Sequence, residues 1–291
     1  MQVVKTFGHY VEKWSDSDPL RARKLLRTGW EAQLLKLKLR PDKRLFDSDQ
    51  YAAKMMMETM LKPLRDPEHS AIVSIFTPCE MLHEAGLHPY NVEAFSCFLN
   101  GSQAERAFLQ QAENAGLSET LCSYHKTFIG AAAKGVMPRP RCIVYTNLAC
   151  DANLLTFSRL ADKFQVPVFS IDVPFKTDQD SVAYVEEQLV RLKSFLSDVS
   201  GIKIEEDKVK ERIRRSRKTL ENYRRFQRER SGKYIPTDLV TPLYSGMTNN
   251  ILLGTKEEEK YTEKLLSDVK KAQPSRGKRI YWMHTIPFWS E

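Results

Sequence analysis

The sequence lacks several features that mark large classes of proteins. It has no apolar run approaching the roughly 20 residues of a membrane-spanning helix, and residues 1–10 contain no apolar core of the signal-peptide kind. No Gly-x-Gly-x-x-Gly motif follows an expected strand, and no Gly-x4-Gly-Lys-Ser/Thr loop is present. We therefore expect no membrane association, no dinucleotide bound in the usual way and no P-loop for ATP.

Cysteine is also scarce. The chain has 5 cysteines in 291 residues, an odd number without a tight spacing ladder. Without a signal peptide, this pattern argues for reduced thiols rather than disulfides, so we expect a cytoplasmic protein. A hydrophobic content of 42% with 10% aromatic residues indicates a packed globular chain.

The chain has a net charge of +8, and its basic residues are densest in one segment. Residues 205–230 predict a long helix with one apolar stripe and many arginines, among which acidic residues are interspersed. We interpret this pattern as a solvated helix face and expect no nucleic acid as partner. The same basic residues could also serve a CoA phosphate or an acidic partner.

Short β-rich apolar runs alternate with helical patterns over the middle of the chain. We expect strands at residues 71–76, 90–98, 141–146 and 166–171, and helices at 79–85, 103–115 and 153–164. Such alternation is typical of β-α-β units that build a parallel sheet. The sequence therefore predicts an α/β fold, with a Rossmann- or flavodoxin-like parallel-sheet domain.

The same patterns divide the chain into four parts. Residues 1–67 predict a helical N-terminal region, 68–200 the parallel α/β domain, and 201–275 a helical segment. Residues 276–291 predict the first strand of a second α/β domain. Because a parallel strand needs partners to bury both faces, we expect the rest of that second domain to be absent from this chain.

Two cysteines stand near the ends of apolar runs. Cys122 and Cys150 lie 28 residues apart, about the length of one β-α-β unit. We expect both at neighbouring strand ends, where open α/β sheets bind their ligands, and two soft thiolates there suggest an iron–sulfur cluster. Buried core cysteines remain the alternative for both. Cys97 is interpreted as core or a substitute ligand, and Cys79 as structural.

Three segments, in order, resemble the 2-hydroxyacyl-CoA dehydratase family, which also includes benzoyl-CoA reductase subunits. The first contains Pro-x-Glu and ends in Ala-Gly, the second begins with Leu-Cys, and the third is a Cys-Asp pair (residues 78–87, 121–130 and 150–151). The likeness covers roughly residues 70–175. Within the family, the chain resembles the D-component of 2-hydroxyglutaryl-CoA dehydratase. The closing strand, which ends in residues 284–288, looks like the opening of the family's second α/β domain.

The resemblance implies an iron–sulfur subunit of a lyase that dehydrates a 2-hydroxyacyl-CoA substrate. Members of the family are heterodimers whose subunits can each carry a 4Fe-4S cluster. A separate ATP-dependent iron–sulfur activator supplies one electron, which makes a ketyl radical of the thioester and permits loss of the hydroxyl group. The ATP site belongs to the activator.

The resemblance also implies roles for individual residues. Cys122 and Cys150 fall on two of the family's cluster-ligand cysteines. Glu80 falls on the acidic position after the first strand, where a carboxylate could move a proton or bind iron, although it could also merely favour a helix N-terminus. The family's third cysteine belongs to the second α/β domain, so we expect an incomplete cluster site here.

Two other functions stay open. One is reduction of an aromatic acyl-CoA, as in benzoyl-CoA reductase, by the same electron supply. The other is a non-catalytic α/β binding protein that folds without a cluster. Assays with acyl-CoA thioesters separate the first from dehydration, and a stable fold without iron would mark the second.

Overall fold

The computed structural model describes residues 2–148, 150–237, 241, 245–246 and 248–278. Three helices open the chain: α1 (Gln2–Ser17), α2 (Pro19–Leu39) and α3 (Asp47–Arg65). The short 3-10 helix η1 (Pro67–His69) then leads into the sheet. The strand expected after residue 276 falls almost wholly outside the described residues.

Helix α2 shows why the N-terminal region folds onto the rest. The Asp18 side chain accepts a hydrogen bond from the Arg21 backbone N–H at 3.0 Å, which caps the helix start. Trp30, on the buried stripe of α2, donates its indole N–H to the Ser102 hydroxyl at 3.0 Å. The Trp30 ring also meets Phe95 edge-on, with centroids 5.6 Å apart.

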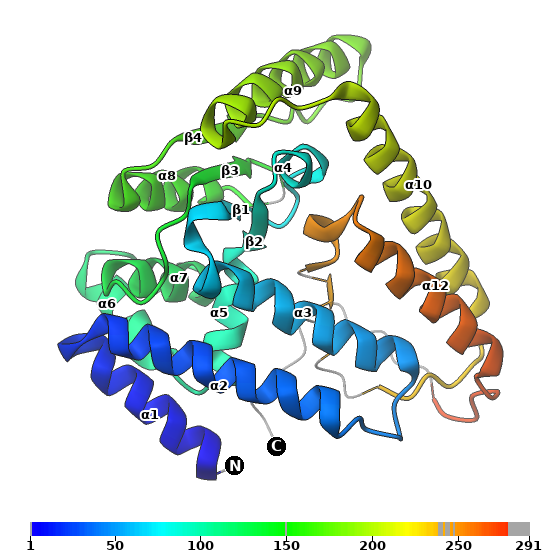
Figure 1. Cartoon of the computed structure of the whole chain (residues 1–291), viewed down its shortest axis with the longest axis horizontal. Coiled ribbons are helices and arrows are strands. Elements are labelled where there is room, and N and C mark those ends of the chain that lie inside the picture. The colour runs from blue at the N-terminus through cyan, green and yellow to red at the C-terminus, as the bar shows by residue number, and fades with distance from the viewer. Residues whose placement is uncertain (1, 149, 238–240, 242–244, 247, 279–291) are drawn as a thin grey trace.

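Four short strands form one parallel sheet. They are β1 (Ser70–Val73), β2 (His88–Asn91), β3 (Cys142–Thr146) and β4 (Val168–Ile171), in the order β2-β1-β3-β4 (Figure 1). Every residue of β1 and β3 is buried, as expected for central parallel strands. The α/β fold class is therefore confirmed. The strand order follows the flavodoxin-like pattern, with its direction of winding reversing between β1 and β3.

Helices surround this sheet. The connections carry α4 (Glu80–Glu84), α5 (Val92–Gly101), α6 (Arg106–Asn114), α7 (Ser123–Ala133) and α8 (Ala152–Phe164). Helices α5, α7 and α8 pack against one another in succession, whereas α4 contacts α9 (Gln179–Ser200). Helices α6 and α7 approach so closely that a Cβ on Gly130 would lie 1.9 Å from the Phe108 carbonyl oxygen.

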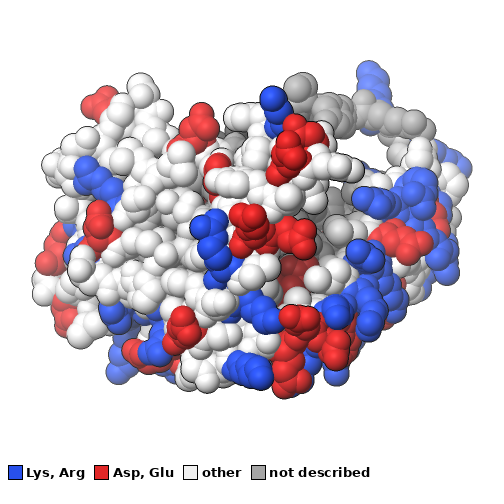
Figure 2. All heavy atoms as spheres, turned by 90° about the horizontal axis from the view of Figure 1, so that it is seen from above, with Lys and Arg blue, Asp and Glu red and all other residues white. Residues whose placement is uncertain are grey.

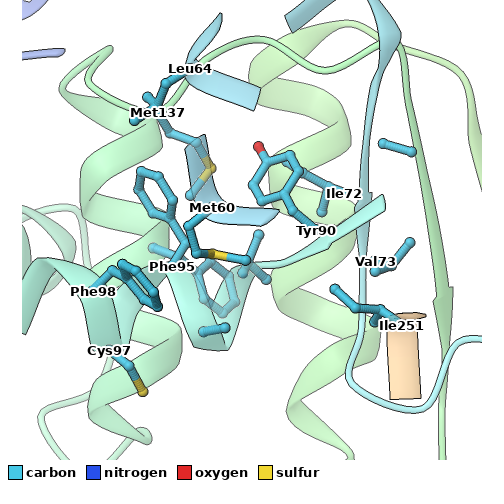
Figure 3. Packing of buried hydrophobic residues seen from close by; sticks show 14 of the residues in the cluster. Met60, Leu64, Ile72, Val73, Tyr90, Phe95, Cys97, Phe98, Met137 and Ile251 are labelled. Carbon is cyan, nitrogen blue, oxygen red and sulfur yellow. The ribbon is translucent and has the colours of Figure 1, made fainter. Parts of the chain in front are cut away.

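The main core lies between the sheet and the N-terminal helices. Figure 3 shows Met60 of α3 packed beside Phe95 of α5 and Tyr90 of β2. Tyr90, Phe95 and Met60 are all fully buried. Burial of these large side chains joins the helical N-terminal region to the α/β part through one continuous hydrophobic core.

The last part of the chain is a helical pair. Helix α10 (Glu206–Glu229) packs along α12 (Lys256–Lys271), and the pair reaches α4 and α3. A 3-10 turn, η2 (Asn250–Leu252), precedes α12. Most residues of α10 are exposed or half-buried, as expected for a solvated helix. Figure 2, viewed from above Figure 1, shows basic and acidic side chains interspersed over the upper face of the molecule. Within the described part of the chain, no helix is long and apolar enough to cross a membrane.

Two expectations were wrong. The strand expected at residues 90–98 is the end of β2 followed by helix α5, because the Asn91 side chain accepts the Ala94 backbone N–H at 2.7 Å and starts a helix. Cys122 was expected at a strand end. It lies instead at the N-cap of α7, after a turn closed by the Leu121 N–H to the Ser118 carbonyl at 3.1 Å.

Candidate functional site

The carboxyl ends of the four strands meet at one edge of the sheet, and the winding reverses there between β1 and β3. In open α/β sheets this is where ligands bind. The loop after β1 is tied to the end of β3, because the Ser74 hydroxyl accepts the Thr146 backbone N–H at 3.1 Å. The Ser74 hydroxyl also lies 2.9 Å from the Thr77 hydroxyl. The floor of the candidate site is thus fixed by buried hydrogen bonds.

The structure separates the five cysteines by accessibility. Cys122 is exposed and Cys150 is half-buried, whereas Cys79, Cys97 and Cys142 are buried. Burial raises the pKa of the Cys97 and Cys142 thiols to about 12 and that of Cys79 well above its usual value. A thiol must lose its proton to bind a metal. Cys122 and Cys150, the two that the sequence singled out, are therefore the accessible ligand candidates.

Cys150 follows β3 and precedes the first turn of α8, as the sequence predicts. Its Sγ lies 3.7 Å from Nε2 of the buried His125 on α7. The opposite ring atom, His125 Nδ1, lies 2.8 Å from the Thr156 hydroxyl. That hydroxyl donates to the Ala152 carbonyl at 2.7 Å, so it accepts from Nδ1–H and leaves Nε2 free to accept a hydrogen bond from the Cys150 thiol. Burial lowers the pKa of His125 to about 4, which keeps the ring neutral.

Cys122 lies on another side of α7, near α5. The Ser96 hydroxyl donates to the Tyr124 carbonyl at 2.8 Å and fixes the start of α7 against α5. The charge of Cys122 raises the pKa of the buried Cys97 thiol, though less than burial does. In Figure 3 the Cys97 side chain extends from α5 away from Met60. Helix α7 thus presents Cys122 toward α5 and His125 toward Cys150.

Glu93 is a buried carboxyl that sequence reasoning missed. It occupies the first turn of α5, one helical turn before Cys97, and its Oε2 atom has no hydrogen-bond partner among the described residues. Burial raises the pKa of Glu93 to about 7, against smaller opposite effects from its own backbone N–H and the Asn91 side chain. Near neutral pH this carboxyl can therefore both release and accept a proton. In the sequence, the sign of this buried carboxyl was a single acidic residue inside an otherwise apolar stretch.

Glu80 begins α4, after β1. Its Oε1 atom accepts a hydrogen bond from the Ser216 hydroxyl of α10 at 2.7 Å. The side chain is half-buried and faces the α10–α12 pair, since a Cβ on Gly254 would lie 3.0 Å from Glu80 Cγ. No contact among the described residues joins Glu80 to Cys122 or Cys150.

The two accessible thiols do not by themselves complete a metal centre. Among the described residues, no group of three or more His, Cys, Asp or Glu side chains is placed to hold a metal ion. The accessible thiols are chemically suited to iron, but they supply only two ligands.

Comparisons with known proteins place this geometry in context. A family profile described as 2-hydroxyglutaryl-CoA dehydratase, D-component, matches residues 74–291. The alpha subunit of (R)-phenyllactyl-CoA dehydratase from Clostridium sporogenes is 23% identical over 182 residues, which are 59% of this chain and 44% of that protein. A benzoyl-CoA reductase subunit from Thauera aromatica is 25% identical over 141 residues, which are 44% of this chain and 33% of that protein. The chain spans less than half the length of either relative.

Proposed function

The chain belongs to the 2-hydroxyglutaryl-CoA dehydratase D-component family, and from that premise we propose that it is a subunit of a 2-hydroxyacyl-CoA dehydratase-like enzyme. The observation that carries the proposal is the selective accessibility of Cys122 and Cys150, of which Cys150 follows β3 at the strand edge where open α/β sheets bind ligands. The enzyme would be a hydro-lyase that removes water from a 2-hydroxyacyl-CoA. We expect this activity in the cytoplasm and in complex with a homologous second subunit.

In this proposal Cys122 and Cys150 would hold a 4Fe-4S cluster, with the remaining protein ligand outside residues 2–278. The cluster, when bound, supplies one-electron chemistry at low potential. An ATP-dependent iron–sulfur activator would deliver the electron. His125 Nε2 would accept a hydrogen bond from the Cys150 thiol across the 3.7 Å contact and so orient the sulfur before it binds iron.

Two carboxyl groups are proposed to handle protons. Glu93 is the better matched in acidity, because burial raises its pKa to about 7. A group with its pKa near the working pH is an effective general acid or base. Glu80 remains a candidate, and its hydrogen bond with Ser216 would have to open or rearrange before the carboxylate reached a substrate.

A second candidate function is reduction of an aromatic acyl-CoA. The likeness to the benzoyl-CoA reductase of Thauera aromatica favours it specifically. Both reactions would use the same cysteines and the same activator, so the substrate distinguishes them. A non-catalytic binding protein is the third alternative.

The test is a substrate assay under strict exclusion of oxygen. The full polypeptide, its partner subunit and the activator would be mixed with ATP, a one-electron donor and either 2-hydroxyacyl-CoA thioesters or benzoyl-CoA. Mass spectrometry would detect loss of water from the former or gain of two hydrogens by the latter. Dehydration supports the proposal, and exclusive reduction supports the second candidate. Absence of both reactions in a complex that contains iron contradicts the enzymatic proposals.

A further inference from the structure

A basic cavity lies at the amino end of the sheet, opposite the carboxyl edge at which Cys150 lies. It has a volume of about 480 Å³ and is lined by the end of α4, the start of β2, the last part of α3, and the facing parts of α10 and α12. Gly86 and His88 mark its position, because they connect α4 to the amino end of β2. Cys150 follows the carboxyl end of β3. The length of the strands, about 10 Å, therefore separates the two places.

Cations outnumber carboxylates on the cavity wall. Five lysine and arginine side chains line it, against three glutamates (Lys62, Lys208, Arg212, Arg215 and Lys256). The two arginines are held in place, since Arg212 Nε lies 3.0 Å from Glu84 Oε2 and Arg215 Nε lies 3.1 Å from Glu259 Oε2. Arg215 also donates from Nη2 to Glu211 Oε1 at 2.9 Å and from Nη1 to the Gly254 carbonyl at 2.8 Å, so protein partners fix its guanidinium group and take three of its five N–H groups.

Two further cations lack such partners. Within the described part of the chain, no carboxylate forms an ion pair with Lys62 or Lys256. Lys256 occupies the first position of α12, where the helix start adds positive potential. The same first turn carries three glutamates, and the Glu258 N–H donates to the Thr255 hydroxyl at 3.2 Å. The positive charge of Lys62 also acts on two histidines of the cavity. Burial is the largest cause of the lowered pKa of His83 and of His88, and Lys62 lowers both further.

The wall also offers fixed polar geometry. His83 donates Nε2–H to the Ile251 carbonyl at 2.7 Å, so the ring joins the floor of the cavity to the segment before α12. Burial lowers the pKa of His83 to about 4, and the ring is therefore neutral. A cavity of this volume is within the range that takes a small organic ligand rather than a single ion. Its excess cations come from three different helices, which a ligand with several negative oxygens could bridge.

We infer that this cavity binds a diphosphate-bearing ligand through Lys62, Lys256 and the arginines of α10. Neither the iron proposal nor the acyl-CoA reaction is needed for this inference, since no cavity residue belongs to the strand edge with Cys150. Two sources share this chemistry: a free nucleoside diphosphate, and the nucleotide end of a CoA thioester. Pyrophosphate carries the common group and is the probe for the site itself.

The test is calorimetric titration with pyrophosphate, ADP and CoA at about 50 mM salt, where charge interactions are only partly screened. Wild type is compared with the double variant Lys62→Ala/Lys256→Ala. Neither lysine forms an ion pair with a described residue, so the fold should persist, and a thermal melt of each variant checks it. Lys5→Ala is the matched control, because Lys5 is an exposed residue on α1.

We expect saturable pyrophosphate binding that weakens by about tenfold or more in the double variant, through loss of charge-assisted hydrogen bonds. The control should bind as wild type does. Displacement of pyrophosphate by CoA would identify the thioester's nucleotide end as the ligand, whereas displacement by ADP alone would identify a free nucleotide. No saturable binding of pyrophosphate to wild type, or equal affinity in the folded double variant, would overturn the inference. Iron-free protein suffices, so this result is separable from failure of the proposed enzyme function.

Discussion

Replacing Glu93 by Gln should change how the stability of the fold depends on pH. Burial raises the pKa of Glu93 to about 7, whereas an unfolded chain leaves a glutamate near its ordinary value of 4.5. The folded state therefore binds this proton more tightly than the unfolded state. As pH rises from 4.5 through about 7, the wild type consequently loses stability, and the loss is complete above pH 7.

The magnitude can be worked out from the shift. One pKa unit corresponds to about 1.4 kcal/mol, so the full cost of ionising Glu93 in the folded state is about 3 kcal/mol above pH 7. At pH 5 most of that cost is still absent. The stability difference between Glu93→Gln and wild type should therefore shift by about 2.5 kcal/mol in favour of the variant between pH 5 and pH 8.

The assay is urea denaturation of both proteins at several pH values. Glu258 also has a pKa raised by burial, to about 8, so the wild type alone would report both carboxyls. The difference between variant and wild type isolates Glu93, and Glu119→Gln, at an exposed position, is the control that should show no such shift. A pH-independent difference for Glu93→Gln would refute the account of a buried, proton-binding carboxyl.

Two other predictions concern packing and thiol access. Gly130→Ala should destabilise the fold by about 3 kcal/mol, because the added Cβ would lie 1.9 Å from the Phe108 carbonyl oxygen. Gly246→Ala, where a Cβ meets no atom within 4 Å, is the control, and a loss below about 1 kcal/mol at Gly130 would contradict the close helix approach. In native metal-free protein, a thiol reagent should modify Cys122 and Cys150 quickly and the buried cysteines only after denaturation. Rapid modification of a third cysteine, located by peptide mapping, would argue against that division.

Much of the sheet could be predicted from the sequence, and its one large error has a physical cause. Runs such as 141–146 are short, apolar and rich in β-branched residues, and they fold as buried strands. The run at 90–98 is equally apolar, but most of it is helix α5, every residue of which from Val92 to Leu99 is buried. A helix buried on all sides has no polar face, so its periodicity cannot be told from that of a buried strand. The deciding group was the Asn91 side chain, which caps the helix.

The candidate site was predicted in part for a similar reason. Cysteine identity and spacing drew attention to Cys122 and Cys150, and the structure makes these two accessible. The partners could not be predicted, because they depend on tertiary packing. His125 meets Cys150 only where α7 packs on α8, and the pKa of Glu93 depends on burial that a lone acidic residue in the sequence does not reveal. Whether Glu80 has a catalytic role remains a prediction.

The central claim is that Cys122 and Cys150 hold an iron–sulfur cluster. The direct measurement is iron and acid-labile sulfide per chain in the full polypeptide, purified without oxygen together with its partner subunit. Cys122→Ser and Cys150→Ser would be measured alongside Cys142→Ala, which changes a buried cysteine of β3. The account predicts about four irons per chain in wild type and in the Cys142 variant, with loss in both serine variants. Iron unchanged by both serine substitutions, or no iron in the wild type, would contradict it.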